Sequence, residues 1–180
     1  MDNMVGKIRI LLADSDGDFC AEMAALCEDA EDMELVGIAE SGEKALTAVG
    51  ELRPDLLITE LSLPGMDGVL LLEQLRGTTA EILICTKSDL VLRDLDLLRE
   101  FPRVTVSWSV NTLDEAFRAD MDRAVSIERR LEAMRLVYEA GIRTVCFVSP
   151  IFPGITDPKA IIERVREFAD LVWLENLNLR

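Results

Sequence analysis

Short apolar segments alternate with amphipathic segments along the chain, and this alternation limits the fold more than any other feature of the sequence. The first apolar segment, Ile8–Ala13, ends in a polar cluster at residues 14–18, and the next segment carries apolar residues at helical spacing. Short continuous apolar runs favour buried strands, whereas apolar residues three or four apart favour helices packed against them. The pattern predicts strands at residues 8–13, 34–39, 55–59, 81–86, 104–109, 144–149 and 171–174, and helices at 19–30, 42–52, 69–76, 90–100, within 114–141 and at 159–168.

Strands and helices in this order form βαβ units, in which helices cover a mainly parallel sheet. We therefore expect an α/β fold with a mainly parallel sheet of about seven strands. The length of 180 residues suits a single domain. The pattern does not decide the strand order, the oligomeric state, or whether the sheet stays open or curls toward a barrel.

The charge of the chain excludes several classes of function. Lys and Arg number 19 against 34 Asp and Glu, which gives a net charge of -15. This charge repels phosphate backbones and anionic membranes, so we expect neither nucleic acid nor a membrane as a partner. The absence of histidine excludes His-based acid–base catalysis and His-ligated metals. With no long apolar run and no signal peptide at the start, we expect a cytoplasmic protein.

The four cysteines do not form a recognisable site. Cys20, Cys27, Cys85 and Cys146 show no C-x-x-C spacing, and their neighbours are mostly apolar. We interpret them as buried free thiols rather than as metal ligands, disulfides or a nucleophile. We expect no metal site and no cofactor.

Charged clusters along the chain have simple structural interpretations. The acidic residues 14–18 lack the glycine and the glutamate that a calcium loop needs, and Asp18 is the predicted N-cap of helix 19–30. Acidic and basic residues between 89 and 99 predict a solvated helix face with local ion pairs. A similar mixed-charge helix surface is predicted for Arg123, Arg129, Arg130 and Arg135.

The composition changes near residues 76–77. Residues 1–76 hold 17 acidic and 5 basic residues, a net charge of -12, whereas residues 77–180 hold 17 and 14, a net charge of -3. The first part has one aromatic residue and the second has eight. The change is either a fluctuation within one domain or a seam between two segments of different ancestry.

Residues 5–76 resemble the receiver domain of bacterial response regulators, in particular the sporulation-control type. The resemblance rests on three stretches at residues 8–14, 33–39 and 54–68, the last reading PDLLITELSLPGMDG. It implies a flavodoxin-like fold for this half of the chain. It covers only the first three βα units of a fold that has five.

The receiver resemblance also implies a phosphoacceptor pocket with Mg²⁺, and several of its positions are changed here. Glu60 stands where the family has the acceptor aspartate, and its longer side chain misplaces the nucleophilic oxygen. Ser15 replaces a charged metal ligand, Asp14 and the Ser62 carbonyl remain, and Thr86 stands at the hydroxyl position after the fourth strand. The family's lysine is missing from residues 107–111. We interpret this as a vestigial pocket with disabled phosphoryl chemistry; a permanent mimic of the phosphorylated state, through Glu60, is the alternative.

Residues 80–180 resemble the C-terminal half of a radical S-adenosylmethionine enzyme of the spore-photoproduct-lyase-like type. Stretches at residues 86–98, 124–131, 149–157 and 173–178 carry this resemblance. It implies a partial (β/α) barrel, but the three-cysteine loop that holds the family's [4Fe–4S] cluster is missing, so we expect no radical chemistry. The resemblance leaves at most a vestigial cofactor-binding set at the strand ends, made of Ser107, Ser109, Asn111, Pro153 and Gly154.

Three functions follow from the sequence. The leading hypothesis is an engineered chimera, a single α/β domain over residues 1–180 built from fragments 1–76 and 77–180, with no catalytic activity. The alternatives are a degenerate receiver that acts as a signalling or binding module, and residual binding of S-adenosylmethionine or phosphate at the strand ends. No protein partner is implied, apart from self-association through an exposed strand edge.

Overall fold

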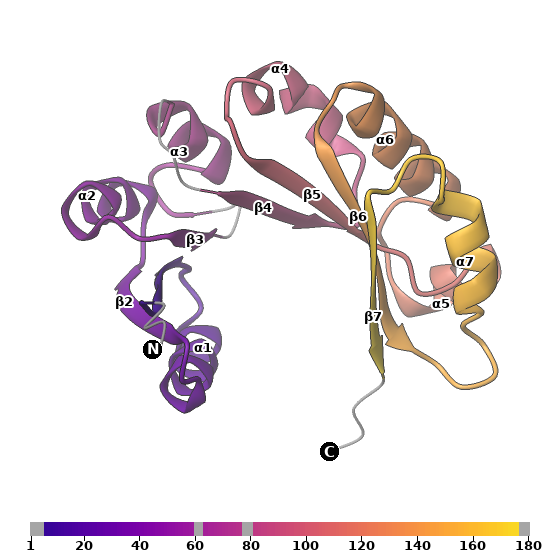
Figure 1. Cartoon of the computed structure of the whole chain (residues 1–180), viewed down its shortest axis with the longest axis horizontal. Helices are drawn as coiled ribbons and strands as arrows, with labels where there is room; N and C mark the ends of the chain where they lie inside the picture. Colours follow the sequence, from indigo (N-terminus) through magenta and orange to yellow (C-terminus); the bar gives the residue numbers. More distant parts are fainter. Residues whose placement is uncertain (1–5, 60–62, 77–80, 177–180) are drawn as a thin grey trace, which may run out of the picture. The chain divides into compact units, whose positions relative to one another are not determined.

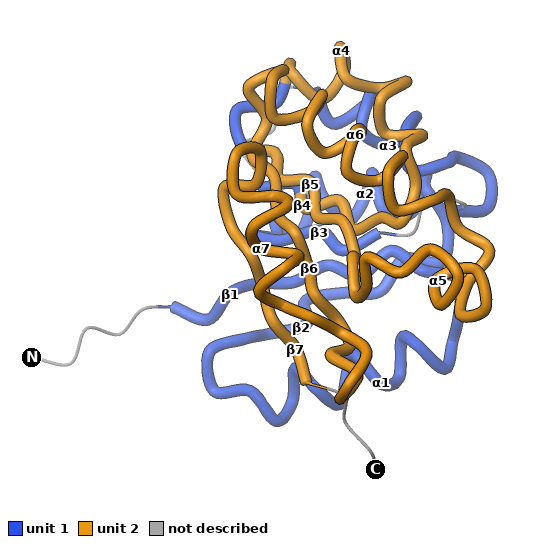
Figure 2. Tube along the Cα trace, turned by 90° about the vertical axis from the view of Figure 1, so that its right-hand side faces the viewer, with its two compact units in different colours: residues 1–82, 101–103 blue, residues 83–100, 104–180 orange. Residues whose placement is uncertain are grey.

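A computed structural model describes residues 6–59, 63–76 and 81–176. The chain divides into two compact units, one of residues 1–82 with 101–103 and one of residues 83–100 with 104–180 (Figure 2). The predicted α/β class is confirmed, because strands and helices alternate along the described residues and the strand pairs with a defined register are parallel. The strands form two sheets, one of three strands and one of four (Figure 1).

The three-stranded sheet of the first unit consists of β1 (Ile8–Ala13), β2 (Met33–Ala39) and β3 (Leu56–Thr59), in the order β2-β1-β3. Its central strand is buried, and Ile10, Leu11 and Leu12 are at most 3% exposed. The third strand returns to the opposite side of β1 from β2, as in doubly wound folds. The elements of this unit are β1 (Ile8–Ala13), α1 (Gly17–Asp29), β2 (Met33–Ala39), α2 (Gly42–Leu52), β3 (Leu56–Thr59) and α3 (Gly68–Gln74).

The loop before α3 packs tightly on the start of α2. The backbone N–H of Gly42 donates to the carbonyl of Pro64 at 3.3 Å. A Cβ atom at Gly42 would lie 2.4 Å from the carbonyl oxygen of Met66, so only glycine permits this approach. The interior beneath the loop consists of small and branched side chains, namely Ala13, Ala39, Ala45, Leu63 and Leu71.

Helix α1 begins at Gly17, and its N-cap is Asp16 rather than the predicted Asp18. A carboxylate oxygen of Asp16 accepts from the backbone N–H groups of Asp18 at 2.9 Å and Phe19 at 3.1 Å. Asp18 therefore lies in the first turn, where its charge faces the positive end of the helix dipole.

Removing the cap is expected to destabilise the first unit more than removing the neighbouring charge. Asp16→Ala should lower the free energy of unfolding by about 1 kcal/mol, because two backbone donors lose their acceptor. Asp18→Ala is the matched control and should cost only about 0.3–0.5 kcal/mol. Urea denaturation of the two variants measures the difference, and a larger loss for Asp18→Ala would contradict this cap assignment.

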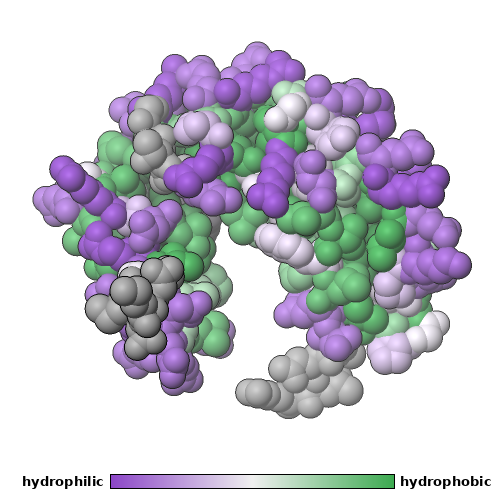
Figure 3. Space-filling view, viewed as in Figure 1, coloured by the Kyte–Doolittle hydropathy of each residue, from purple (hydrophilic) through white to green (hydrophobic). Residues whose placement is uncertain are grey.

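The four-stranded sheet of the second unit has the simple order β4-β5-β6-β7. Helices α4 (Leu95–Leu98), α6 (Ile127–Glu139) and α7 (Pro158–Val165) lie along one side of it in Figure 1. Figure 3 shows hydrophilic residues over these helices and hydrophobic residues gathered over the strands. The elements are β4 (Ile82–Thr86), the 3-10 helix η1 (Leu90–Asp94), α4 (Leu95–Leu98), β5 (Val104–Ser109), α5 (Glu115–Met121), α6 (Ile127–Glu139), β6 (Arg143–Ile151), α7 (Pro158–Val165) and β7 (Leu171–Asn176).

Two predicted helices are divided in the structure. The segment 90–100 is a 3-10 turn followed by the short α4. The region 114–141 forms two helices, as the sequence allowed, and each has its own cap. Asp114 caps α5 through the N–H groups of Ala116 and Phe117, and Ser126 caps α6.

The interior of the second unit is organised around Trp108 on β5, which is fully buried. Its indole N–H donates to the carbonyl of Ser88 at 3.0 Å, which satisfies the one polar group of the side chain. Apolar side chains of α6 are buried as well, and α6 contacts both β5 and β6. They are Ile127, Leu131, Ala133, Met134 and Val137.

All four cysteines are free thiols, and three of them are buried as predicted. The prediction is wrong for Cys85, which is exposed on β4. Strand β4 alternates between partly buried and exposed residues, so an apolar sequence does not bury every side chain there. Burial raises the pKa of Cys146 to about 12, which keeps that thiol protonated at neutral pH. Among the described helices, none combines the length and the apolar character of a membrane span.

Candidate functional site

The first two residues of the predicted phosphoacceptor pocket lie at the carboxyl end of β1. Asp14 directly follows the strand, and its backbone N–H donates to the carbonyl of Ala39 at 3.0 Å. Strands β1 and β3 end at the paired residues Ala13 and Thr59. Glu60 and Ser62, which complete the predicted pocket on this side, lie outside the described residues.

The carboxylates of Asp14 and Asp16, which follow β1, accept hydrogen bonds from backbone N–H groups of the loop that begins there. A carboxylate oxygen of Asp14 accepts from the N–H of Asp16 at 2.8 Å, and Asp16 itself caps α1. In the described part of the chain, no three or more His, Cys, Asp or Glu residues are grouped so that they could hold a metal ion. With a serine at position 15, the described part of this pocket offers fewer charged ligands than the receiver resemblance implies for Mg²⁺.

Thr86 ends β4 and belongs to the second unit. Its hydroxyl accepts from the N–H of Ser88 at 2.9 Å, and the Ser88 hydroxyl accepts from the N–H of Leu90 at 3.1 Å. The Ser88 carbonyl is the acceptor for the Trp108 indole. The hydroxyl of Thr86 therefore shapes the turn that receives the central tryptophan.

Part of the predicted cofactor-binding set is brought together at the carboxyl ends of β5 and β6. The hydroxyl of Thr156 donates to the Asn111 carbonyl at 2.7 Å and accepts from the N–H of Phe152 at 2.9 Å. Pro153 and Gly154 lie within this turn, and Gly154 has a φ of 78°, which favours glycine.

Two members of the set lie inside the sheet instead. Ser107 is 2% exposed and pairs with Val145, and Ser109 pairs with Phe147. The Ser109 carbonyl is the acceptor of a hydrogen bond from Arg130 at 3.1 Å. In these positions the two serines contribute to the packing of β5 rather than to an open pocket.

Arg130 departs most from what the sequence predicts. It was predicted on a charged helix surface, but it is 1% exposed. Its guanidinium donates to the carbonyls of Val125 at 3.0 Å and Ser109 at 3.1 Å, and to the carboxylate of Asp122 at 2.9 Å. The spacing held a signal, because residue 130 shares the face of α6 that carries Met134 and Val137.

The connection between α5 and α6 is held by several more charged contacts. Arg118 donates to the Ala124 carbonyl at 2.9 Å and pairs with Glu115. The other carboxylate oxygen of Glu115 accepts from the N–H of Ile127 at 3.0 Å, and this hydrogen bond holds the pKa of Glu115 below its usual value. Together with Arg130 these contacts fix the segment that borders the carboxyl ends of β5 and β6.

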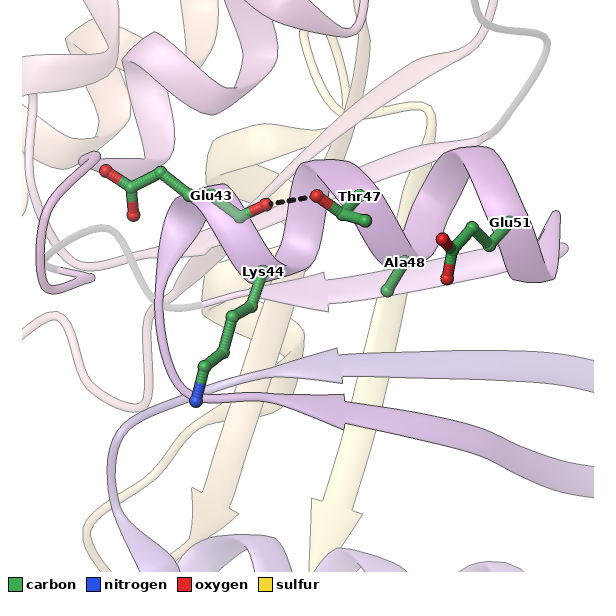
Figure 4. A pocket seen from close by; sticks show the side chains of 5 residues that line it. All are labelled: Glu43, Lys44, Thr47, Ala48 and Glu51. Carbon is green, nitrogen blue, oxygen red and sulfur yellow. Dashed lines mark hydrogen bonds between the residues drawn. The ribbon is translucent and has the colours of Figure 1, made fainter.

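A shallow depression on the first unit runs along helix α2 (Figure 4). The Thr47 hydroxyl donates to the Glu43 carbonyl at 3.0 Å, and Lys44 pairs with Glu40 at 2.7 Å. All of the lining residues come from one helix, so they do not converge on a common point. They are Glu43, Lys44, Thr47, Ala48 and Glu51.

The comparison with protein families gives a match over about half of the chain. Residues 10–97 match the response regulator receiver domain. The match begins within β1 and supports the receiver resemblance seen in the sequence. It continues past Arg76 to Leu97, beyond the place where the composition changes.

Relatives of two kinds share sequence with the chain. The DNA-binding response regulator MtrA of Mycobacterium bovis is 39% identical over 93 residues, which cover 51% of this chain and 39% of that protein. An uncharacterized protein of Methanocaldococcus jannaschii is 38% identical over 102 residues, 56% of this chain and 39% of that protein. The chain therefore spans about two fifths of the length of these relatives.

Two solved structures resemble the fold of the chain. Streptococcus suis SuiB bound to S-adenosylmethionine has a TM-score of 0.63 at 15% identity, with 97% of this chain and 42% of that chain covered. Salmonella typhimurium RcsB, a response regulator, has a TM-score of 0.50 at 16% identity, with 76% of this chain and 70% of that chain covered. At such identities the likeness concerns the fold alone.

Proposed function

We propose that this chain is a receiver-derived α/β scaffold that has lost phosphoryl transfer and carries no catalytic activity. The observation that carries the proposal is the loop after β1, where one carboxylate oxygen of Asp14 accepts from the backbone N–H of Asp16 and one of Asp16 caps the start of α1. Ser15, between them, supplies no charge. A receiver needs free carboxylates here to hold the cation that lets a third carboxylate approach a phosphate.

The proposal extends to the origin of the chain. We infer that a receiver fragment, residues 1–76, was joined by design to a barrel-type fragment, residues 77–180. The change in charge and aromatic content near the junction supports this reading. The chain resembles both a response regulator and SuiB, each likeness covering most of its length, and the family match runs past the junction.

Incubation with acetyl phosphate and Mg²⁺, followed by intact-mass measurement, tests the loss of phosphoryl transfer. We expect no phosphoryl adduct on the wild-type chain. The double variant Ser15→Asp/Glu60→Asp is the matched control, because it restores the charged ligand and the shorter acceptor. We expect this variant to gain a detectable adduct under the same conditions.

The outcomes separate the proposal from its alternatives. An adduct on the wild-type chain would contradict the proposal and make a working signalling receiver the better interpretation. An adduct on the double variant alone assigns the loss to positions 15 and 60. If neither chain is labelled, the loss also involves the missing lysine after the fifth strand of the receiver pattern.

A further inference from the structure

Three cationic side chains of the second unit meet at the carboxylate of Asp122. Arg130 donates to its two oxygens at 2.9 and 3.3 Å, and the ammonium nitrogen of Lys87 lies 3.5 Å from it. A guanidinium nitrogen of Arg118 lies 3.8 Å from it, and the backbone N–H of Ala124 donates to it at 3.0 Å. These groups come from the loop after β4, from α5, from α6 and from the α5–α6 connection. They therefore surround the carboxylate instead of following one helix.

Positive charge is in excess around this carboxylate. The three cations face two anions, Asp122 and Glu115, the second of which pairs with Arg118, so these five side chains carry a net charge of +1. The whole chain has a net charge of -15, so the cluster is opposite in sign to the chain as a whole. Since the cluster is positive with Asp122 in place, and reaches +2 without it, it attracts a small anion.

The cluster has one buried and one accessible side. The side chain of Arg130 is only 2% exposed, whereas that of Asp122 is 24% exposed and that of Lys87 is 48% exposed. The guanidinium of Arg130 also donates to the carbonyls of Val125 and Ser109, so its direction is fixed by two contacts that do not involve Asp122. The buried donor is therefore held in place at a position that solvent reaches from the side of Lys87.

We propose that this cluster is a binding site for a small carboxylate, which the chain keeps filled with its own Asp122. Asp122 extends into the cluster from the C-cap of α5, so it is a tethered ligand that competes with a free carboxylate at a high effective concentration. A free carboxylate offers the same pair of oxygens to Arg130 and to the N–H of Ala124, and such charge-assisted hydrogen bonds are the strong ones. The site is closed in the wild-type chain, and it opens when the carboxylate of Asp122 is removed.

Binding of formate to the variant Asp122→Ala tests the proposal, because formate replaces the carboxylate group that the substitution removes. We expect formate to raise the midpoint of thermal unfolding of this variant, with saturation. The backbone amide resonance of Ala124 in a proton–nitrogen NMR spectrum should shift with the same dependence on formate, since this N–H donates to the bound ligand. The wild-type chain in the same formate series controls for general effects of salt and should show neither response.

Further substitutions separate this site from a general response to charge. In the Asp122→Ala background, Arg130→Met removes the buried donor and should raise the dissociation constant of formate by about tenfold or more. Lys159→Met in the same background is the matched control and should leave that constant unchanged, because the Lys159 side chain lies on α7, is 86% exposed and pairs with Glu163. Asp122→Ser is a second way to empty the site and should bind formate as Asp122→Ala does.

Several results would overturn the proposal. They are equal responses to formate in the wild-type chain and in Asp122→Ala, an amide resonance of Ala124 that formate does not shift, and equal losses of formate binding with Arg130→Met and Lys159→Met. If an Asp122 variant is unfolded in buffer, formate is expected to restore its fold. A variant that stays unfolded at every formate concentration would contradict a site that formate fills.

Discussion

Replacing Asp122 by alanine is expected to lower the free energy of unfolding of the second unit by about 3 kcal/mol. The reason is that the guanidinium of Arg130 stays buried at 1% exposure while it loses the carboxylate to which it donates. Breaking a buried ion pair from one side typically costs about 3–5 kcal/mol. We expect the lower end of this range because the Asp122 side chain is 24% exposed and two carbonyls still accept from Arg130.

The double variant Asp122→Ala/Arg130→Met separates the contribution of the ion pair to stability from the contribution of side-chain packing. It removes the buried charge together with its partner, so it should recover a large part of the loss. Urea denaturation followed by tryptophan fluorescence measures both variants, since both tryptophans lie in this unit. A double variant less stable than Asp122→Ala would show that Arg130 stabilises the unit through the packing of its side chain rather than through its charge.

The same ion pair gives a direction for the pH dependence of stability. Burial raises the pKa of Asp122. Arg130, the backbone N–H of Ala124 and Lys87 together lower that pKa by more than burial raises it, so it lies below its usual value. A carboxyl group with a lowered folded-state pKa stabilises the fold above its unfolded-state pKa, and this stabilisation is lost as the pH falls through the folded value. Below about pH 4, the wild-type chain should therefore lose stability more steeply than Asp122→Ala.

Trp108→Ala is expected to have an effect of similar or larger size, about 3–5 kcal/mol. The side chain is fully buried, and truncation leaves a cavity in the interior of β5 and α6 while the Ser88 carbonyl loses its donor. Trp108→Phe retains most of the ring and should cost clearly less. Thermal unfolding followed by circular dichroism measures both, because the substitution removes a fluorophore.

The second tryptophan provides the matched control. Trp173 is 41% exposed and packs on one side only, against Phe147, so Trp173→Ala should cost about 1 kcal/mol. Equal losses for the two tryptophans would show that β5 is not the centre of this interior.

The order and type of the elements could be predicted because hydrophobic periodicity is a local property. Strands 8–13 and 104–109 have the predicted bounds, and most other boundaries differ by one or two residues. The position of the N-cap was less accessible, because Asp14, Asp16 and Asp18 are equally suited by type and only the geometry selects Asp16.

The features that escaped prediction depend on three-dimensional packing. Charge usually signals exposure, so the sequence predicts Arg130 at the surface, yet its acceptors come from β5, at residue 109, and from the α5–α6 connection, at residues 122 and 125. Cys85 was placed in the interior because its neighbours are apolar, but burial on β4 depends on which face each residue occupies. The division of seven strands into two sheets is a long-range property that periodicity does not encode.

In the second unit each strand pairs with the strand that follows it in the chain. Contacts between consecutive βα units are separated by short stretches of sequence, so closing each loop costs little chain entropy and the contact order stays low. Such a unit can assemble stepwise from β4 to β7 as the chain leaves the ribosome. In the first unit β3 pairs with β1 on the side opposite β2, so this pairing joins residues that lie farther apart in the sequence than those of the β1–β2 pair.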